Sequence, residues 1–176
     1  MRTKKMKYLW FVVILAIFCL TLFLARSRSK VLMRNRIYRQ WSEHFVVSKG
    51  KESFVRTSND ADQSVVLSEG QSYGMLITVA AARKGQAQQE DFDRLYQYYL
   101  KHRLEGTQLM SWKQTINNGK TKAEDHNATD GDLYIAYALL EAAQQWPKQA
   151  KEYQAQAKAI LEDILTYNYN EETGVL

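Results

Sequence analysis

Cysteine and proline are nearly absent from this chain, which has one of each, Cys19 and Pro147. With a single cysteine no disulfide can form within the chain, so a small disulfide-built domain is excluded. With a single proline, proline-rich linkers and collagen-like segments are excluded as well. The three histidines, His44, His102 and His126, lack the spacing of metal ligands. We therefore expect neither a metal nor another cofactor.

Acidic residues are missing from residues 1–36, which carry nine Lys and Arg. The rest of the chain then holds 15 basic and 19 acidic residues, so it is negatively charged although the whole chain has a formal charge of +5. Nucleic-acid binding requires a basic surface on the domain itself. The charge distribution therefore predicts no nucleic-acid partner.

An uncharged apolar run of eighteen residues extends from Tyr8 to Ala25, which is about the length that crosses a bilayer as a helix. Basic residues flank it on both sides and do not select an orientation, but the short basic tail before it resembles the start of an export signal. We expect residues 1–30 to be a basic N-region with a transmembrane signal anchor (8–25), and residues 31–176 to be an extracellular domain. A cleaved signal peptide and a secreted domain are the alternative.

Strict alternation of polar and apolar residues is scarce in the rest of the chain, where apolar residues recur at the spacing of amphipathic helices. This pattern predicts five helical blocks, at 35–46, 68–84, 88–103, 130–146 and 148–166. Two very short strands are expected, at 64–67 and 109–112. The sequence therefore predicts an all-α domain.

Two long connections, at 47–67 and 104–129, each precede a helical block, whereas the other connections are very short. If successive helices run antiparallel, these two blocks point the same way and begin at the same end of the domain. Long irregular connections in a compact domain are usually functional. Glu69 and Asp130, at the starts of the two blocks, are therefore expected on one loop-rich face.

The first of these helix starts reads Ser68-Glu69-Gly70-Gln71-Ser72-Tyr73-Gly74-Met75. Ser68 and Gln71 have the spacing of a capping box, which predicts reciprocal hydrogen bonds at the helix N-terminus. Glu69 in the first turn either complements the helix dipole or serves as a catalytic carboxylate. The second start, Asp130-Gly131-Asp132, is by itself a turn with an N-cap, a cation site or a catalytic carboxylate.

Both stretches resemble hallmarks of glycoside hydrolase family 8. Residues 128–146 fit its signature A-[ST]-D-[AG]-D-x-x-[IM]-A-x-[SA] through to a tryptophan, and residues 68–75 are similar to its SEGQxYGM motif. The resemblance implies an inverting hydrolase of β-1,4-linked polysaccharides on an (α/α)6 barrel, with Glu69 as the proton donor. It assigns Asp130 as the second carboxylate, either a nucleophile or the residue that orients the sugar at the cleavage point.

Three further residues are candidates for substrate binding. Trp112 resembles a family position on the loop before the signature, where it stacks on a sugar ring or pins the loop. Tyr73 either lines the cleft or packs in the core. Asp132 is a cap or an orienting partner of Asp130 rather than a second catalyst.

The resemblance covers about residues 35–176, which correspond to the N-terminal half of a family member, with about five of the twelve barrel helices. We therefore expect a truncated family member whose missing C-terminal half carries the water-activating aspartate, and which is inactive alone. The alternative is a membrane-tethered remnant that binds a glycan without cutting it. The sequence does not select among cellulose, mixed-linkage glucan, xylan and chitosan as the polysaccharide.

Overall fold

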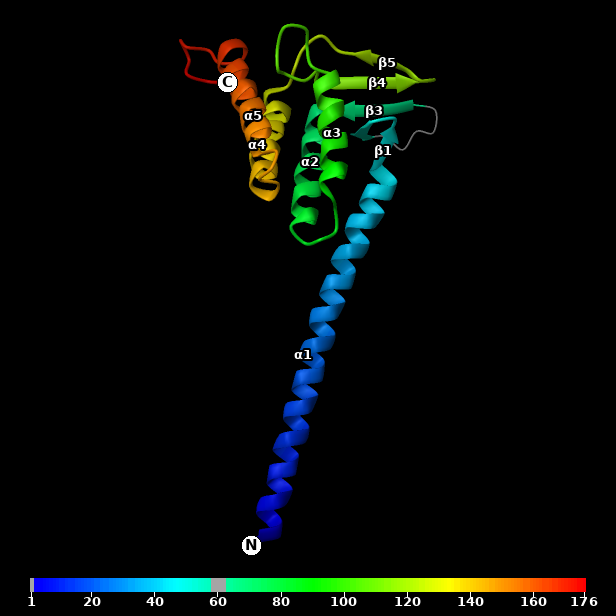
Figure 1. Cartoon of the computed structure of the whole chain (residues 1–176), viewed down its shortest axis with the longest axis vertical. Coiled ribbons are helices and arrows are strands. Elements are labelled where there is room, and N and C mark those ends of the chain that lie inside the picture. The colour runs from blue at the N-terminus through cyan, green and yellow to red at the C-terminus, as the bar shows by residue number, and fades with distance from the viewer. Residues whose placement is uncertain (1, 58–62) are drawn as a thin grey trace. The chain divides into compact units, whose positions relative to one another are not determined.

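The computed structural model describes residues 2–57 and 63–176, which belong to two compact units, Met1–Gln40 and Trp41–Leu176. Nearly all of the first unit is a single helix, α1 (Arg2–Phe45), which continues without a break into the start of the second unit (Figure 1). No glycine or proline occurs before Gly50, so no helix-breaking residue separates the apolar run from the block expected at 35–46. These two predicted helices are one.

From Met6 to Ile37, the described large apolar side chains of α1 are between 39% and 73% exposed, whereas those of Tyr38, Trp41 and Phe45 are partly buried. Within the described residues, α1 is the one helix that is long and apolar enough to cross a membrane, by length and composition alone.

The described part of the second unit contains five short strands, so the prediction of an all-α domain is wrong in this respect. A hairpin joins β1 (Val46–Lys49) to β2 (Glu52–Val55), and β3 (Gln63–Leu67), β4 (Lys113–Asn117) and β5 (Lys120–Ala123) form an antiparallel sheet in that order. Apolar alternation missed all of these except β3 because they are short, and all four residues of β5 are also exposed.

The strand expected at 64–67 is confirmed as β3, which pairs with β4 through contacts such as Val65 with Thr115. The strand expected at 109–112 is wrong. Met110 and Ser111 form only isolated bridges, to Arg103 and Asn127. The ladder begins at Lys113, immediately after this segment.

Four helices build the body of the second unit, close to the predicted blocks. They are α2 (Ser68–Ala82), α3 (Gln89–Lys101), α4 (Thr129–Gln145) and α5 (Ala150–Tyr167). Helix α2 packs against α3 and α4, and α4 packs against α5. Figure 1 shows β3 and β4 at the end of the unit where α2 and α4 begin.

Helices α2 and α4 run parallel to each other. Their N-termini meet at Ser68 and Gly131, and near their other ends Arg83 forms an ion pair with Glu141 at 2.6 Å. Helices α3 and α5 return in the opposite direction, so the unit is a series of two helical hairpins, as in part of an (α/α) barrel.

The core lies between the helices and is closed by strand residues. Side chains that are no more than 2% exposed include Val66, Met75, Val79, Phe92, Leu95, Tyr99, Ile135, Leu139, Tyr153 and Ile160. Burial of a large apolar side chain stabilises a fold by about 1.5–3 kcal/mol. The pairing of α2 with α4 is therefore an integral part of the core.

The capping box predicted for Ser68 and Gln71 is wrong. The N-cap of α2 is Leu67, and no side chain caps this terminus. Gln71 is fully buried instead: its Oε1 accepts from Val55 N at 2.9 Å, and its Nε2 donates to the carbonyls of Ser53 at 3.1 Å and Leu95 at 2.9 Å. Gln71 thereby joins β2, α2 and α3, because a buried amide satisfies backbone groups that water cannot reach.

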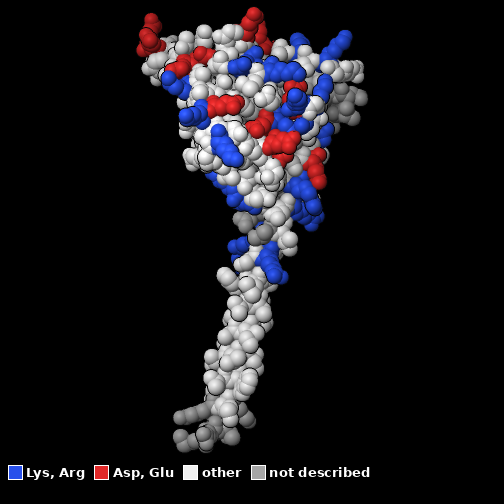
Figure 2. Space-filling view, in the orientation of Figure 1, with Lys and Arg blue, Asp and Glu red and all other residues white. Residues whose placement is uncertain are grey.

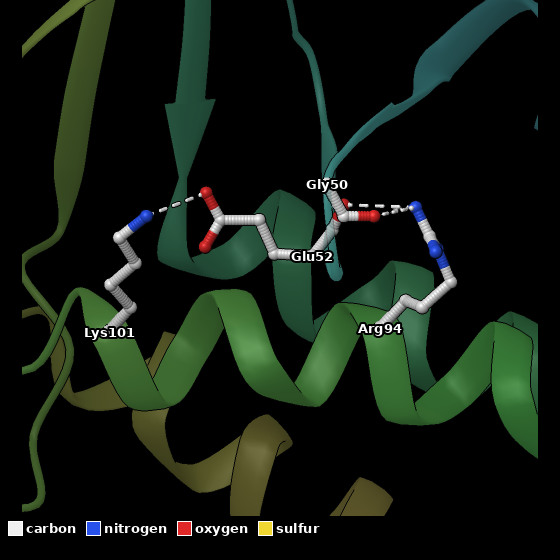
Figure 3. Close-up of polar contacts among 4 residues, drawn as sticks. All are labelled: Gly50, Glu52, Arg94 and Lys101. Atoms are coloured by element: carbon white, nitrogen blue, oxygen red, sulfur yellow. Dashed lines mark hydrogen bonds and ion pairs between the residues drawn. The ribbon is translucent and has the colours of Figure 1, made fainter.

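The β1–β2 hairpin is held on α3 by two cations (Figure 3). Arg94 donates from Nη2 to the carbonyl oxygen of Gly50 at 2.9 Å, and Lys101 pairs with Glu52 at 2.9 Å. Gly50 has a φ of 58° at the turn, a conformation that favours glycine. These contacts hold β2, whose backbone forms hydrogen bonds with Gln71, against α3.

Candidate active site

The two predicted carboxylate positions lie next to each other because α2 and α4 touch at their first turns. A Cβ atom added to Gly131 would lie 2.7 Å from Cβ of Ser68 and closer still to its Oγ. Ser68 precedes Glu69, and Gly131 follows Asp130, so this contact places the two acidic residues in adjoining first turns of α2 and α4. Both residues are exposed.

Two tyrosines lie one helical turn after the two acidic residues, Tyr73 on α2 and Tyr134 on α4. The Tyr73 hydroxyl is hydrogen-bonded to the Glu69 side chain, and this bond is the largest cause that raises the pKa of Tyr73 to about 12. Tyr73 therefore remains a neutral phenol at neutral pH. Its ring lies 5.1 Å from that of Tyr134, tilted by 55°. Residues four apart share one side of a helix, so Tyr73 lies on the same side of α2 as Glu69, and Tyr134 lies on the same side of α4 as Asp130.

The loop that carries Trp112 is bonded to the start of α2. The carbonyl of Trp112 accepts from Ser68 N at 2.9 Å, and its own N–H donates to the carbonyl of His126 at 2.9 Å. The indole is partly buried, with the His126 ring 5.8 Å away and Lys113 Nζ 5.6 Å from the ring centroid. Trp112 is thus fixed next to Glu69 by its backbone.

Asp132 is fully buried and serves the loop. Its Oδ1 accepts from Met110 N and its Oδ2 from Asn127 Nδ2, both at 2.8 Å. Burial raises the pKa of Asp132 to about 6, although the two hydrogen bonds oppose the shift. Asp132 thereby joins α4 to both ends of the segment that contains Trp112.

Apolar and aromatic side chains remain exposed along α2 and α4 beyond the two carboxylates. They are between 37% and 51% exposed and comprise Tyr73, Ile77, Leu133, Tyr134, Tyr137 and Leu140. We call this set the open face. An exposed group of this kind marks an interaction surface in soluble proteins.

The model of glycosyl hydrolases family 8 matches residues 11–176 of the chain. This chain belongs to glycosyl hydrolases family 8.

Curated relatives of this chain are considerably longer than the chain itself. A beta-glucanase from Niallia circulans is 34% identical over 139 residues, which is 77% of this chain and 33% of that protein. An endoglucanase from Cellulomonas uda is 35% identical over 115 residues, or 64% of this chain and 30% of that protein. The chain thus spans about a third of these curated relatives.

Solved structures also match this chain over only part of their length. The apo structure of a beta-1,3-1,4-glucanase from Paenibacillus sp. X4 matches with a TM-score of 0.66 and 31% identity, covering 82% of this chain and 38% of that one. An endo-beta-1,4-glucanase from an Achatina fulica gut metagenomic library matches with a TM-score of 0.59 and 30% identity, covering 73% and 37%. The helical hairpins of this chain are therefore part of the family 8 fold.

Sequence reasoning missed Tyr134 and the contact between Ser68 and Gly131. The signal for Tyr134 was present, since it follows Asp130 at the same spacing at which Tyr73 follows Glu69. The Ser68–Gly131 contact joins residues far apart in the chain, and no local pattern reports it. The burial of Asp132 was likewise not evident, because its loop partners lie outside its own helix.

The free energy of unfolding of this family 8 chain should depend on pH through the titration of the Asp132 carboxyl group. Its pKa of about 6 exceeds the ordinary value of 3.8, so between these values the folded chain holds a proton that the unfolded chain has released. The group therefore stabilises the fold fully below about pH 4, and this contribution, about 3 kcal/mol at most, is lost as the pH rises through about 6.

Replacing Asp132 with asparagine, which does not titrate, removes this dependence while an amide oxygen still accepts from Met110. We expect the unfolding free energy of the wild type, relative to Asp132→Asn, to fall between about pH 4 and pH 7 in urea titrations. A difference between the two chains that is the same at every pH contradicts the assignment.

Proposed function

We propose that this chain supplies the acid side of an inverting glycosidase site for β-linked glucan. The observation that carries the proposal is the contact of Ser68 with Gly131, which sets two exposed carboxylates at adjacent helix N-termini. A beta-glucanase and endoglucanases among the relatives support the substrate class.

In this proposal Glu69 donates a proton to the glycosidic oxygen. Its exposure leaves the carboxyl group accessible to a polysaccharide, and the hydrogen bond with Tyr73 limits its orientation. Protonation of the leaving oxygen is the task of the general acid in a glycosidase. The leaving sugar then departs as a neutral alcohol.

Asp130 is the second carboxylate of the proposed site. Its Oδ1 accepts from Gly131 N at 2.8 Å, which orients the side chain at the first turn of α4. There it holds the sugar at the cleavage point or acts as a nucleophile. An inverting enzyme places its acid and base about 6.5–9.5 Å apart so that a water molecule fits between the base and the sugar.

Trp112 and Tyr73 are the proposed sugar contacts. Both are aromatic side chains beside Glu69, and an aromatic ring packs against the apolar face of a pyranose. Asp132 is buried, and we assign it the role of holding the loop that presents Trp112.

We further propose that the active form includes residues beyond those of this chain, which supply the water-activating base and cover the open face. The length of the relatives and the exposure of six large side chains on α2 and α4 support this. We expect the purified chain to release little or no reducing sugar from barley β-glucan or carboxymethylcellulose. Robust release that is abolished by Glu69→Gln would show that the chain is complete for catalysis.

A non-catalytic glycan-binding role is the second candidate, and the exposed ring pair of Tyr73 and Tyr134 on the open face favours it. Calorimetric titration of the chain with cellohexaose tests this binding role. Binding without hydrolysis, weakened by Trp112→Ala, supports the binding role. The absence of both contradicts it.

We also propose that α1 anchors the chain in a membrane with the domain outside the cell. Support comes from its length, its exposed apolar side chains and its position at the N-terminus. Cleavage of this helix as a signal peptide, with release of the domain, is the alternative. Detection of the apolar segment in the mature membrane-bound protein by mass spectrometry distinguishes them.

A further inference from the structure

The segment of α1 that follows the apolar run carries a concentrated positive charge. Four side chains in it are exposed, those of Arg26, Arg28, Lys30 and Arg36. The first acidic residue of the whole chain is Glu43. These cations therefore have no carboxylate partner on their own segment, and Figure 2 shows blue side chains on the helix beyond the white apolar stretch.

The cations surround the helix instead of lying on one side. Successive residues of an α-helix are rotated by about 100°, so Arg28 points away from Arg26, and Arg36 points to a third direction. A helix that packs one basic face against a partner protein carries its charge as a stripe. A ring of charge suits a helix that is surrounded by its binding partner, as a membrane-crossing helix is by lipid.

The axial positions of the cations correspond to a lipid headgroup layer. The eighteen apolar residues span about 27 Å as a helix, close to the thickness of a hydrocarbon core of about 30 Å. Arg26 then lies at its boundary, and Lys30 lies about 6 Å further out. Arg36 is about 15 Å beyond Arg26, outside the headgroups but still close enough to feel their charge.

We propose that Arg26, Arg28 and Lys30 form a collar that binds anionic phospholipid headgroups around α1, with Arg36 adding long-range attraction. The inference rests on the proposed membrane anchoring of α1. Arginine in the collar donates to two phosphate oxygens at once, and the positive charge of the collar favours headgroups that carry no compensating cation. The second unit carries a net negative charge and does not attract anionic lipid. The collar therefore concentrates anionic lipid around α1.

The test uses the full chain in vesicles of phosphatidylcholine with phosphatidylglycerol and measures the preference of spin-labelled anionic over zwitterionic lipid for the protein. Each cation near an anionic surface contributes about a fivefold preference. We expect the preference of the wild type to fall at least about tenfold in Arg26→Gln/Arg28→Gln/Lys30→Gln, since Arg36 and the basic residues before Tyr8 remain in both chains. It should also weaken with rising salt.

The matched control removes three exposed cations of the second unit, as Lys120→Gln/Lys122→Gln/Lys151→Gln. It should keep the wild-type preference. Equal preferences in wild type and collar variant, or a loss as large in the control, overturn the proposal.

Anchoring is measured separately, as carbonate-resistant insertion into vesicles of phosphatidylcholine alone. Insertion without lipid preference overturns the collar and leaves the anchor intact, whereas absence of insertion overturns both. Displacement of the chain from vesicles by soluble polyphosphate would assign the cations to a soluble polyanion and would likewise overturn the proposal.

Discussion

We expect the replacement of Glu69 with glutamine to lower the hydrolysis of β-glucan by about 10²–10⁴-fold in a fusion protein that adds the further residues proposed above. This fusion joins the full chain to the part of the Paenibacillus sp. X4 glucanase that it does not match, since the chain covers 38% of that protein. Glutamine has the size of Glu69 and keeps a hydrogen bond with Tyr73, but it has no acidic proton to donate to the leaving oxygen.

A substrate with a good leaving group identifies the lost step. The dinitrophenolate group of a dinitrophenyl β-cellobioside departs without protonation, so Glu69→Gln should slow the hydrolysis of this substrate by no more than about tenfold. Glu90→Gln, an exposed first-turn carboxylate on α3, is the matched control and should change neither rate. Equal losses on both substrates would assign Glu69 a role other than proton donation.

Replacing Gly131 with valine destabilises the second unit by about 3 kcal/mol or more and separates Glu69 from Asp130. An added Cβ atom would lie 2.7 Å from Cβ and 3.0 Å from the carbonyl carbon of Ser68, so the helices must move apart. Neither of these two Ser68 atoms lies at the end of a flexible side chain, so neither can move aside without a shift of α2. Urea unfolding measures the loss, and the separation should also lower oligosaccharide binding.

Alanine at Gly131 provides a graded test, because the family signature accepts either residue at this position. Gly131→Ala should cost less than Gly131→Val, since a single methyl group requires a smaller shift of α4. Ser68→Gly removes the side-chain atoms that the methyl group meets, and in a double-mutant cycle it should recover part of the loss. Strict additivity of the two substitutions would show that the contact does not set the helix spacing.

The helices were predictable because they depend on local information. Apolar residues at helical spacing located α2 to α5 to within a few residues, and Pro147 marks the end of α4 at Gln145. The strands were less predictable, since β5 is entirely exposed and is ordered by its pairing with β4. A strand of this kind has no apolar alternation to reveal it.

Side-chain partners across the fold were not predictable. Gln71 fits a capping box by spacing, yet its amide bonds to residues that lie up to 24 positions away, since that is where buried backbone groups lack partners. Asp132 fits a cap equally well, but it accepts from Met110, 22 positions earlier. Spacing alone does not distinguish a local hydrogen bond from a distant one.

The sequence by itself determined the two carboxylate-bearing helix starts, the separation of the basic N-terminal segment from the acidic domain, and the family resemblance, because each is encoded in contiguous residues. Only the tertiary structure decided that Ser68 and Gly131 touch, that Tyr73 and Tyr134 pair on the open face, and that Asp132 holds the loop of Trp112. These contacts join segments distant in the chain, and their geometry follows from the packing of α2 against α4.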